Sequence, residues 1–410
     1  MAKHDMNERA QTGNGARATS PLRGLNLERV LAVAMDHQGP FTRAELIQAT
    51  GLSAPTVGNL ASNLIREGLI TDLGAGPSRG GRRPFFMEFN ARHGFVAGID
   101  LGATRTRLAL ADLRGQVLAH RVVPTPLRGA PASVLAAIVK EVRTLLKDAD
   151  VSPRQLLAVG AGSPGVVDPA RGLVVTLAPN LKGWSNVPMA KILKRELGAP
   201  VVLENDVNLA ILGERWRGVA HGHDTCAFIT LGRGIGAGIV INGKLHHGHH
   251  FLAGEIALMC MGPQFIETDF GMRGCLETMA GLDGLSTLWE HPARGDGSRW
   301  VAELFTAAES GDRRAGTTVE QAATLIGMAI ANLSIVLDPS LIVLGGALIA
   351  QGKPLVHELR RIVGRIIPTP PRLVVSQLHE EAPLWGSLLL STTFARERLR
   401  EQLRDGRVPQ

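Results

Sequence analysis

Hydrophobic and polar positions follow different patterns before and after about residue 93. Upstream, apolar residues recur at helical spacing in three short segments. From Gly94–Asp100 onward, β-rich runs alternate with helical ones, which is typical of an α/β fold. The clearest helix is Ala132–Asp148, whose apolar face carries Val134, Leu135, Ile138, Val139, Val142, Leu145 and Leu146. We therefore expect a compact module over residues 21–92 and an α/β domain over residues 93–410. The polar residues 1–20, rich in Gly, Ala and Thr, should form a disordered leader.

The three helical segments have the order of a helix-turn-helix. The first covers Leu27–His37. Thr42 can cap the second, and Glu45, three residues later, completes a capping box. Gly51 allows a tight turn, and Ser53 can then cap the third helix. This third helix would enter the major groove of DNA by its N-terminal part.

The segment Gly68–Asn90 predicts a wing beside these helices. Two strand-like runs flank a loop that holds arginines among glycines, and such arginines can reach phosphates or the minor groove. The alternative interpretation is a three-helix interaction module with a solvated basic loop. The residues predicted to contact DNA are Ser53, Thr56, Asn59, Arg79, Arg82 and Arg83.

Composition says little about the binding partner but indicates the cellular compartment. The 44 Lys and Arg exceed the 37 Asp and Glu, for a net charge of +7, which suits a polyanion and also many ordinary proteins. Three cysteines are too few for a disulfide framework. The first twenty residues carry no apolar stretch, and no run approaches the roughly 18 apolar residues of a membrane span. We expect a cytoplasmic protein that does not enter the membrane.

Three glycine-rich turns of the α/β domain could cradle phosphates. They lie in Gly98–Arg107, Thr230–Gly238 and Ile342–Gly346, each beside a strand pattern. Asp100 could hold a magnesium ion through water. The first two turns are far apart in sequence, which is consistent with a duplicated two-lobed fold. The predicted nucleotide-binding residues are Asp100, Gly102, Thr104, Gly232, Gly234, Gly236, Gly345 and Gly346.

Taken together, these turns resemble the ROK family of repressors, open reading frames and kinases. Further matches are Gly160–Gly165 with Asp168, Ala178–Leu181 with Trp184, Leu203–Asn208, Ala253–Ile256 and Gly274–Glu277. The resemblance covers about residues 94–395, and the upstream module is similar to that of the family's repressor branch. It implies an actin-like, hexokinase-like (ribonuclease H-like) ATPase fold of two lobes, with a C-terminal helix that returns to the first lobe.

The resemblance also implies roles for individual residues. Asp206 would be the general base that takes a proton from a sugar hydroxyl, if kinase activity is retained. Hydroxyls of a bound hexose need polar partners, because an unpaired hydroxyl in a dry pocket is costly. The implied sugar-binding residues are Asn180, Asn205, Asp206, Glu255 and Glu277.

Three departures from the family pattern bear on chemistry. Leu258 stands where the family usually has a histidine, and Thr268 and Phe270 replace two cysteines of its zinc site. Cys275 alone cannot hold a tetrahedral zinc, so we predict no zinc at this site. Arg233 replaces a threonine of the second cradle, which leaves binding of ATP and magnesium open. A nearby histidine cluster could hold a metal but is more simply an exposed loop: His246, His247, His249 and His250.

We therefore expect a transcriptional regulator of carbohydrate metabolism, a repressor of operator DNA that senses a sugar or sugar derivative and acts as a homodimer or dimer of dimers. Two alternatives stay open at this point. One is an ATP-dependent kinase for a hexose or amino sugar with an accessory DNA-binding module. The other is a regulator that ignores small ligands and responds to a protein partner.

Overall fold

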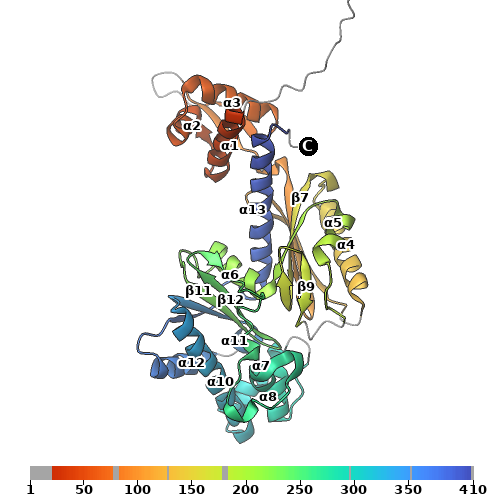
Figure 1. Ribbon diagram of the computed structural model, residues 1–410, viewed down its shortest axis with the longest axis vertical. Coiled ribbons are helices and arrows are strands. Elements are labelled where there is room, and N and C mark those ends of the chain that lie inside the picture. Colours follow the sequence, from red (N-terminus) through yellow and green to blue (C-terminus); the bar gives the residue numbers. More distant parts are fainter. Residues whose placement is uncertain are drawn as a thin grey trace, which may run out of the picture. The chain divides into compact units, whose positions relative to one another are not determined.

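The computed structural model describes residues 21–76, 83–126, 129–177, 183–294, 297–350 and 353–407 (Figure 1). Its contacts divide the chain into two compact units. The first contains residues 1–93 and 396–410, and the second contains residues 94–395. The division at residue 93 coincides with the change of hydrophobic pattern. The predicted leader, residues 1–20, lies outside the described residues.

The first unit contains short helices and an antiparallel sheet of strand order β1-β3-β2. Its elements are α1 (Pro21–Asp36), β1 (Phe41–Thr42), α2 (Arg43–Thr50), α3 (Ala54–Arg66), β2 (Ile70–Ala75) and β3 (Phe85–Phe89). The hairpin β2–β3 has Ile70 paired with Phe89 and Ala75 with Phe85. This is the winged helix-turn-helix expected from the sequence.

Local side-chain bonds explain where α2 and α3 begin. The backbone N–H of Glu45 donates to Thr42 Oγ1 at 3.3 Å, and the Thr42 N–H donates to Glu45 Oε2 at 2.6 Å. The predicted capping box is therefore confirmed. Gly51 ends α2 at φ 67°, a left-handed conformation that glycine adopts without strain. Ser53 caps α3 by accepting from the N–H of Thr56.

The last residues of the chain belong to the first unit, which corrects the expected domain of residues 93–410. They form the end of α13 (Ala382–Arg404). Arg400 Nη2 bonds Glu28 Oε1 of α1 at 2.8 Å, and Arg396 bonds Asp36 at the end of the same helix. Leu399 and Leu403 of this segment are buried. These ion pairs between residues far apart in sequence, together with the burial of the two leucines, explain the assignment.

The second unit begins with a five-stranded sheet of order β10-β7-β4-β5-β6. Its strands are β4 (Phe95–Leu101), β5 (Arg105–Asp112), β6 (Val117–Pro124), β7 (Leu156–Ser163) and β10 (Val201–Asn205). Helices α4 (Pro131–Asp148) and α5 (Met189–Leu197) lie side by side on it (Figure 1). All seven apolar residues predicted for one face of α4 are buried. A small hairpin pairs β8 (Val166–Asp168) with β9 (Leu173–Thr176).

A second five-stranded sheet repeats this topology with the order β13-β12-β11-β14-β15. Its strands are β11 (Cys226–Leu231), β12 (Ile235–Ile241), β13 (Lys244–Leu245), β14 (Leu341–Gly345) and β15 (Arg372–Val375). In each sheet a three-stranded antiparallel meander is followed by two strands parallel to its first strand. The expected duplicated, two-lobed α/β fold is confirmed.

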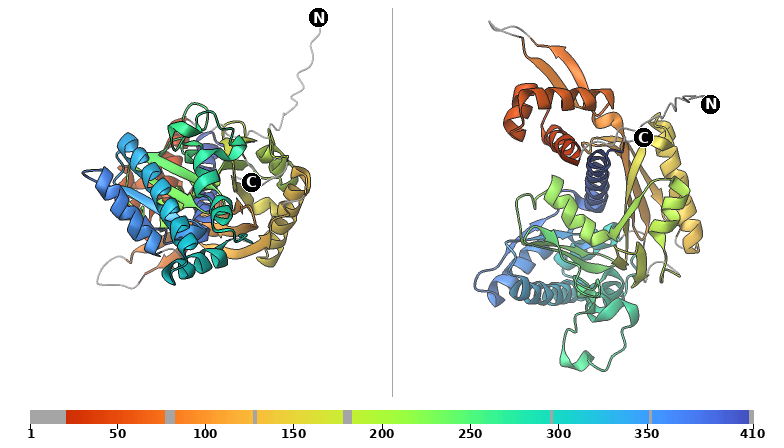
Figure 2. Two further views of the ribbon diagram at one scale, coloured as in Figure 1. Left: turned by 90° about the horizontal axis from the view of Figure 1, so that it is seen from below. Right: turned by 45° about the horizontal axis from the view of Figure 1, so that its top comes forward.

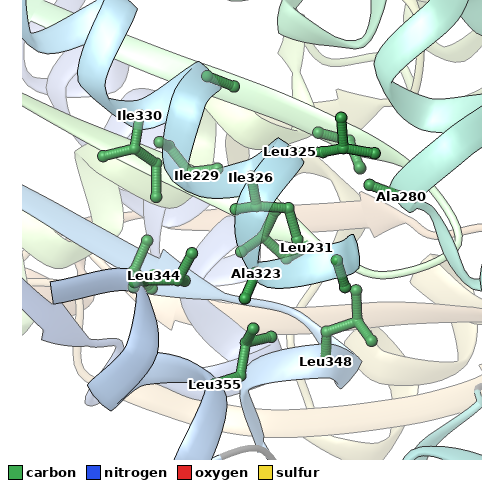
Figure 3. Packing of buried hydrophobic residues seen from close by; sticks show 14 of the residues in the cluster. Ile229, Leu231, Ala280, Ala323, Leu325, Ile326, Ile330, Leu344, Leu348 and Leu355 are labelled. Carbon is green, nitrogen blue, oxygen red and sulfur yellow. The ribbon is translucent and has the colours of Figure 1, made fainter. Parts of the chain in front are cut away.

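Helices cover both faces of the second sheet, because side chains along β11 alternate in direction. Figure 3 shows Ile229 and Leu231 of β11 beside Ile326 and Ile330 of α10 on one face. Phe228 packs with Ile211 of α6 on the other. Figure 2 shows α10 and α12 lying together. The helices are α6 (Asp206–Arg217), α7 (Gly274–Ala280), α8 (Leu282–Trp289), α9 (Ser298–Glu309), α10 (Arg313–Leu337), α11 (Ala347–Ala350) and α12 (Lys353–Ile366).

One helix among the described residues, α10, is long and apolar enough to cross a membrane by length and composition alone. More than half of its most apolar window is buried inside the second unit. A buried core helix passes the same test, so this finding is weak evidence for a membrane span.

Helices α6 and α13 cross at very short distance in the second unit. A Cβ atom built on Gly386 would lie 1.9 Å from the carbonyl oxygen of Leu209, and one on Gly213 would lie 2.2 Å from that of Ala382. The start of α13 also packs on the first sheet, where Gly160 of β7 faces the backbone of Ser387. This crossing therefore fixes the N-terminal end of α6, which carries the candidate site.

Candidate functional site

A pocket of the second unit lies at the N-terminus of α6. Residues from both lobes line it: the turn after β7, the β10–α6 junction, the β11–β12 hairpin, the loop after β13, and α7. Its polar lining residues are Asn205, Asp206, Asn208, Thr230, His247, Glu255 and Glu277. The structure thus brings together four of the five sugar-binding residues predicted from the sequence. The fifth, Asn180, lies outside the described residues.

The start of α6 positions two of these side chains. Asn205 is the N-cap, and its Oδ1 accepts from the N–H groups of Val207 at 2.9 Å and Asn208 at 3.0 Å. Its Nδ2 donates to the carbonyl of Gly165, in the turn after β7, at 3.0 Å. Asn205 therefore ties the helix to the first lobe and holds Asp206, the first helical residue, in the pocket.

Three carboxylates converge in this pocket, and burial raises the pKa of each. The pKa of Asp206 rises to about 6, and bonds from backbone N–H groups oppose the rise. Burial, with the nearby charges of Asp206 and Glu277, raises the pKa of Glu255 to about 7. Burial also raises the pKa of Glu277, whose Oε2 accepts from the N–H of Ile235 at 3.0 Å. A carboxyl group can donate to a sugar hydroxyl when protonated and accept from one when ionised, and a raised pKa makes the protonated form more accessible.

A buried carboxylate behind the pocket orients a histidine of its lining. Glu204 Oε1 accepts from the N–H of Asn205 at 2.8 Å and from Asn208 Nδ2 at 2.9 Å. Its Oε2 lies 2.7 Å from His247 Nε2. The bond to Glu204 raises the pKa of His247 against the opposing effect of burial. The sequence predicted that the histidine cluster lies exposed on a loop. This is correct for His246, His249 and His250, which are exposed, but wrong for the half-buried His247.

The predicted nucleotide-binding residues do not all lie together. Gly234 and Gly236 line the pocket. Gly232 and the third cradle are neighbours, because Thr230 pairs with Gly345 and a Cβ on Gly232 would lie 3.6 Å from the Ala347 nitrogen. Gly346 follows at φ 90°, close to the Leu231 backbone. The cradle of Asp100, Gly102 and Thr104 forms the β4–β5 turn, outside this pocket lining.

Ion pairs occupy the charged groups of both main cradles. Arg107 Nη1 lies 3.5 Å from the buried Asp100 carboxylate, and Arg107 also bonds Glu380. Burial raises the pKa of Asp100 to about 7, the Arg107 charge opposes the rise, and the Asp206 charge adds to it. In the second cradle Arg233 bonds Asp283 of α8, to which Arg273 also bonds at 2.8 Å.

The segment that resembles the family's zinc site is held by other contacts. The Met261 N–H donates to Cys275 Sγ at 3.4 Å, and this thiol lies 3.8 Å from the Met279 sulfur. Within residues 21–407, apart from the undescribed gaps, no group of three or more His, Cys, Asp or Glu side chains is arranged to hold a metal ion.

The predicted DNA-contacting residues occupy the first turns of α3 and the wing. Asn59 and Ser53 are exposed, while Thr56 is half-buried with its hydroxyl 2.9 Å from that of Ser53. Arg83 is exposed two residues before β3, the second wing strand. Arg79 and Arg82 lie outside the described residues.

Sequence reasoning missed two features of these sites. His247 and Glu204 were not predicted as a pair, although Glu204 lies in the quoted block Leu203–Asn208. On α3, the spacing from Asn59 places Asn63 and Arg66 on the same helix face, and these two side chains bond each other. The helical period alone could have found the second feature.

Replacing Asp206 by asparagine should stabilise the ligand-free protein at alkaline pH. The unfolded carboxyl titrates near 3.8 and the folded one near 6, so the folded state binds more protons and its stability falls as pH rises through this window. The neutral amide avoids this loss, and we expect a gain of roughly 1–3 kcal/mol at pH 8 that largely disappears by about pH 4. Urea unfolding at both pH values measures it. The exposed Glu309→Gln is the control, and an equal gain at both pH values would contradict the argument.

Two repeated sheets around a carboxylate-lined pocket, preceded by a winged helix-turn-helix, define a two-lobed, hexokinase-like fold joined to a DNA-binding module. The chain belongs to the ROK family, whose sequence profile matches residues 96–393. The xylose repressor of Caldicellulosiruptor bescii is 29% identical over 355 residues, covering 84% of this chain and 88% of the relative.

Two solved structures have the same architecture. The ROK hexokinase of Thermus thermophilus matches with a TM-score of 0.63 and 30% identity, over 74% of this chain and 99% of the hexokinase. A ROK family transcriptional regulator, a homologue of the E. coli MLC protein, matches with a TM-score of 0.70 over 95% of this chain and 98% of its own. At 23% identity this second match shows the fold alone. The fold of the kinase extends over the α/β domain, and that of the regulator over nearly the whole chain.

Proposed function

We propose that this chain is a sugar-responsive transcriptional repressor. The observation that carries the proposal is the presence, in one chain, of a winged helix-turn-helix and a pocket lined by four of the side chains predicted to bind a sugar. The xylose repressor supports it. Its alignment covers 84% of this chain, which is more than the whole stretch from residue 96, where the family match begins, to the end of the chain. It therefore includes part of the N-terminal module, which the hexokinase alignment need not do.

The pocket suggests how a ligand would act. Asn205 belongs to the first lobe, whereas Glu277 belongs to the second, so a sugar that contacts both would favour the closed arrangement of the lobes. In a homodimer or a dimer of dimers, such closure would change the spacing of two DNA-binding modules. Their half-sites would lie about one helical turn, or a multiple of it, apart.

Selection of bound DNA from a random duplex library, with and without a panel of sugars, tests this function. We expect a pseudo-palindromic sequence whose binding weakens steeply with salt and in the presence of one class of sugar. Failure to enrich any sequence at moderate salt would rule out the repressor. Enrichment that no sugar alters would instead favour a regulator that answers to a protein partner.

A sugar kinase is the second candidate, because Asp206 sits in the pocket with its pKa raised to about 6, suitable for a general base. The cradles argue against it. The charged groups that would face magnesium and phosphates, Asp100 and Arg233, are paired within the protein with Arg107 and Asp283. These residues fit an ATP–magnesium group poorly, and we infer that the nucleotide site is not used.

We therefore expect no sugar-dependent release of ADP in coupled assays with hexoses and amino sugars. Asp206→Asn is the control for any background turnover. Sugar-dependent turnover that this substitution abolishes would establish the kinase instead.

A further inference from the structure

Glu204 and His247 form a pair that the sugar-binding residues described above leave unexplained. The Glu204 side chain, near the end of strand β10, is only 6% exposed although it carries a carboxylate. Both of its oxygens have partners: Asn205 and Asn208 bond Oε1, and the His247 ring bonds Oε2 at 2.7 Å. A buried carboxylate with this set of bonds fixes whatever group it holds, because releasing any partner would leave it unsatisfied.

The bond to Glu204 determines which ring nitrogen of His247 is available to a ligand. A carboxylate accepts hydrogen bonds, so Nε2 keeps its proton. Nδ1 has no hydrogen-bond partner among the residues that the structure describes, and 31% of the side chain is exposed. His247 lines the same pocket as Asp206 and Glu255. Nδ1 accepts a hydrogen bond when the ring is neutral and donates one when it is charged.

We propose that His247 binds the effector through Nδ1, that Glu204 positions it, and that the effector is an unphosphorylated, uncharged sugar. This inference rests on the proposed function of the pocket. A sugar hydroxyl both donates and accepts, so it suits either protonation state of Nδ1. A phosphate or carboxylate of the ligand would face Asp206, Glu255 and Glu277, with one imidazole that Glu204 already pairs.

Two substitutions separate a ligand contact from a structural role. The amide of a glutamine reaches about as far as Nε2, so His247→Gln keeps a partner for Glu204 but removes the polar atom at Nδ1. The amide of an asparagine reaches about as far as Nδ1, so His247→Asn keeps the polar atom facing the ligand but loses the bond to Glu204. The exposed neighbour His246→Gln is the matched control.

Calorimetry with D-xylose, D-glucose and glucose 6-phosphate, together with thermal unfolding of each ligand-free variant, measures both roles. We expect His247→Gln to weaken binding of the tightest neutral sugar by roughly 3- to 10-fold, the effect of one lost hydrogen bond, without lowering the unfolding temperature. His247→Asn should bind that sugar more tightly than His247→Gln, although it unfolds at lower temperature. His246→Gln should match the parent protein in both measurements.

Glu204→Gln tests positioning by a readout that stability does not affect. In the parent protein, the ring ¹⁵N signal of His247 Nδ1 should shift when the sugar is added, and Nε2 should stay protonated. In Glu204→Gln the titration of the ring should move to lower pH, because the neutral amide no longer stabilises the imidazolium. Glu204 bonds the ring from behind the pocket. The carboxyl groups that line the pocket itself are Asp206, Glu255 and Glu277.

Each outcome bears on one claim. Unchanged sugar affinity in His247→Gln, or an Nδ1 signal that does not shift when the sugar is added, would overturn the proposed contact. Either result would leave the proposed repressor function unaffected. Tighter binding of glucose 6-phosphate than of both neutral sugars would overturn the ligand class. If neither the neutral sugars nor the phosphate bound the parent protein, the sensing function and this inference would both be lost.

Discussion

Replacing Gly386 by alanine is expected to destabilise the second unit by about 2–3 kcal/mol, the upper part of the range for overpacking a tight interior. The new Cβ would lie 1.9 Å from the carbonyl oxygen of Leu209 on α6. Both groups in this clash belong to backbone, so no side chain can rotate away and the two helices must separate. Gly213→Ala, on the facing helix, should have a similar effect, since its Cβ would lie 2.2 Å from the Ala382 carbonyl oxygen.

Tryptophan fluorescence during urea unfolding measures this effect in the second unit alone. All five tryptophans lie in it: Trp184, Trp216, Trp289, Trp300 and Trp385. The control is Gly364→Ala in α12, where a Cβ would have nothing within 4 Å. That substitution should stabilise the helix by up to about 1 kcal/mol, because alanine favours helix over glycine. Equal destabilisation by Gly386→Ala and Gly364→Ala would show that helix packing at Gly386 is not the cause.

Asn59→Ala is expected to weaken binding to the selected operator by roughly 10- to 100-fold, the usual effect of losing a bidentate contact to a base edge. Asn59 is exposed in the first turns of α3, opposite the buried Val57 and Leu60. Alanine favours helix more than asparagine does, so weaker binding cannot result from unfolding of α3. The loss should be confined to operator DNA and absent for random duplex.

Arg83→Ala provides the contrasting variant. An exposed wing arginine that contacts phosphate should weaken operator and random DNA alike and lower the slope of affinity against salt by about 1. Fluorescence anisotropy with both duplexes at four salt concentrations distinguishes the two patterns. If Asn59→Ala reduced binding to random DNA as strongly as to operator DNA, α3 would not be the element that reads sequence.

Features that depend on neighbouring residues were predictable from the sequence. The capping box joins Thr42 and Glu45, which are three positions apart, and the turn at Gly51 needs one glycine. The buried face of α4 follows from the helical period. The two-lobed fold and the convergence of the carboxylates were predicted from the resemblance to a family, through the order of its motifs. Spacing along the sequence alone does not place Asp206 beside Glu277.

Contacts between distant segments were not predictable. His247 meets Glu204 across 43 positions of sequence, and Arg107 meets Glu380 across 273. Neither pair has a local pattern, because folding of the sheets brings the partners together. The same reason explains why four adjacent histidines looked alike in the sequence, although only His247 lies against a buried carboxylate.

Because the last residues of the chain belong to the first unit, they determine which truncated fragments of this protein can fold. A fragment that stops at His93 would keep every helix and strand expected of the DNA-binding module. However, Glu28 and Asp36 would lose their arginine partners, and Gly24 of α1 would lose its close contact with the Arg404 backbone. A carboxy-terminal affinity tag or a trimmed tail would likewise disturb the amino-terminal module. A separately expressed DNA-binding module should therefore include residues 396–407, joined by a linker.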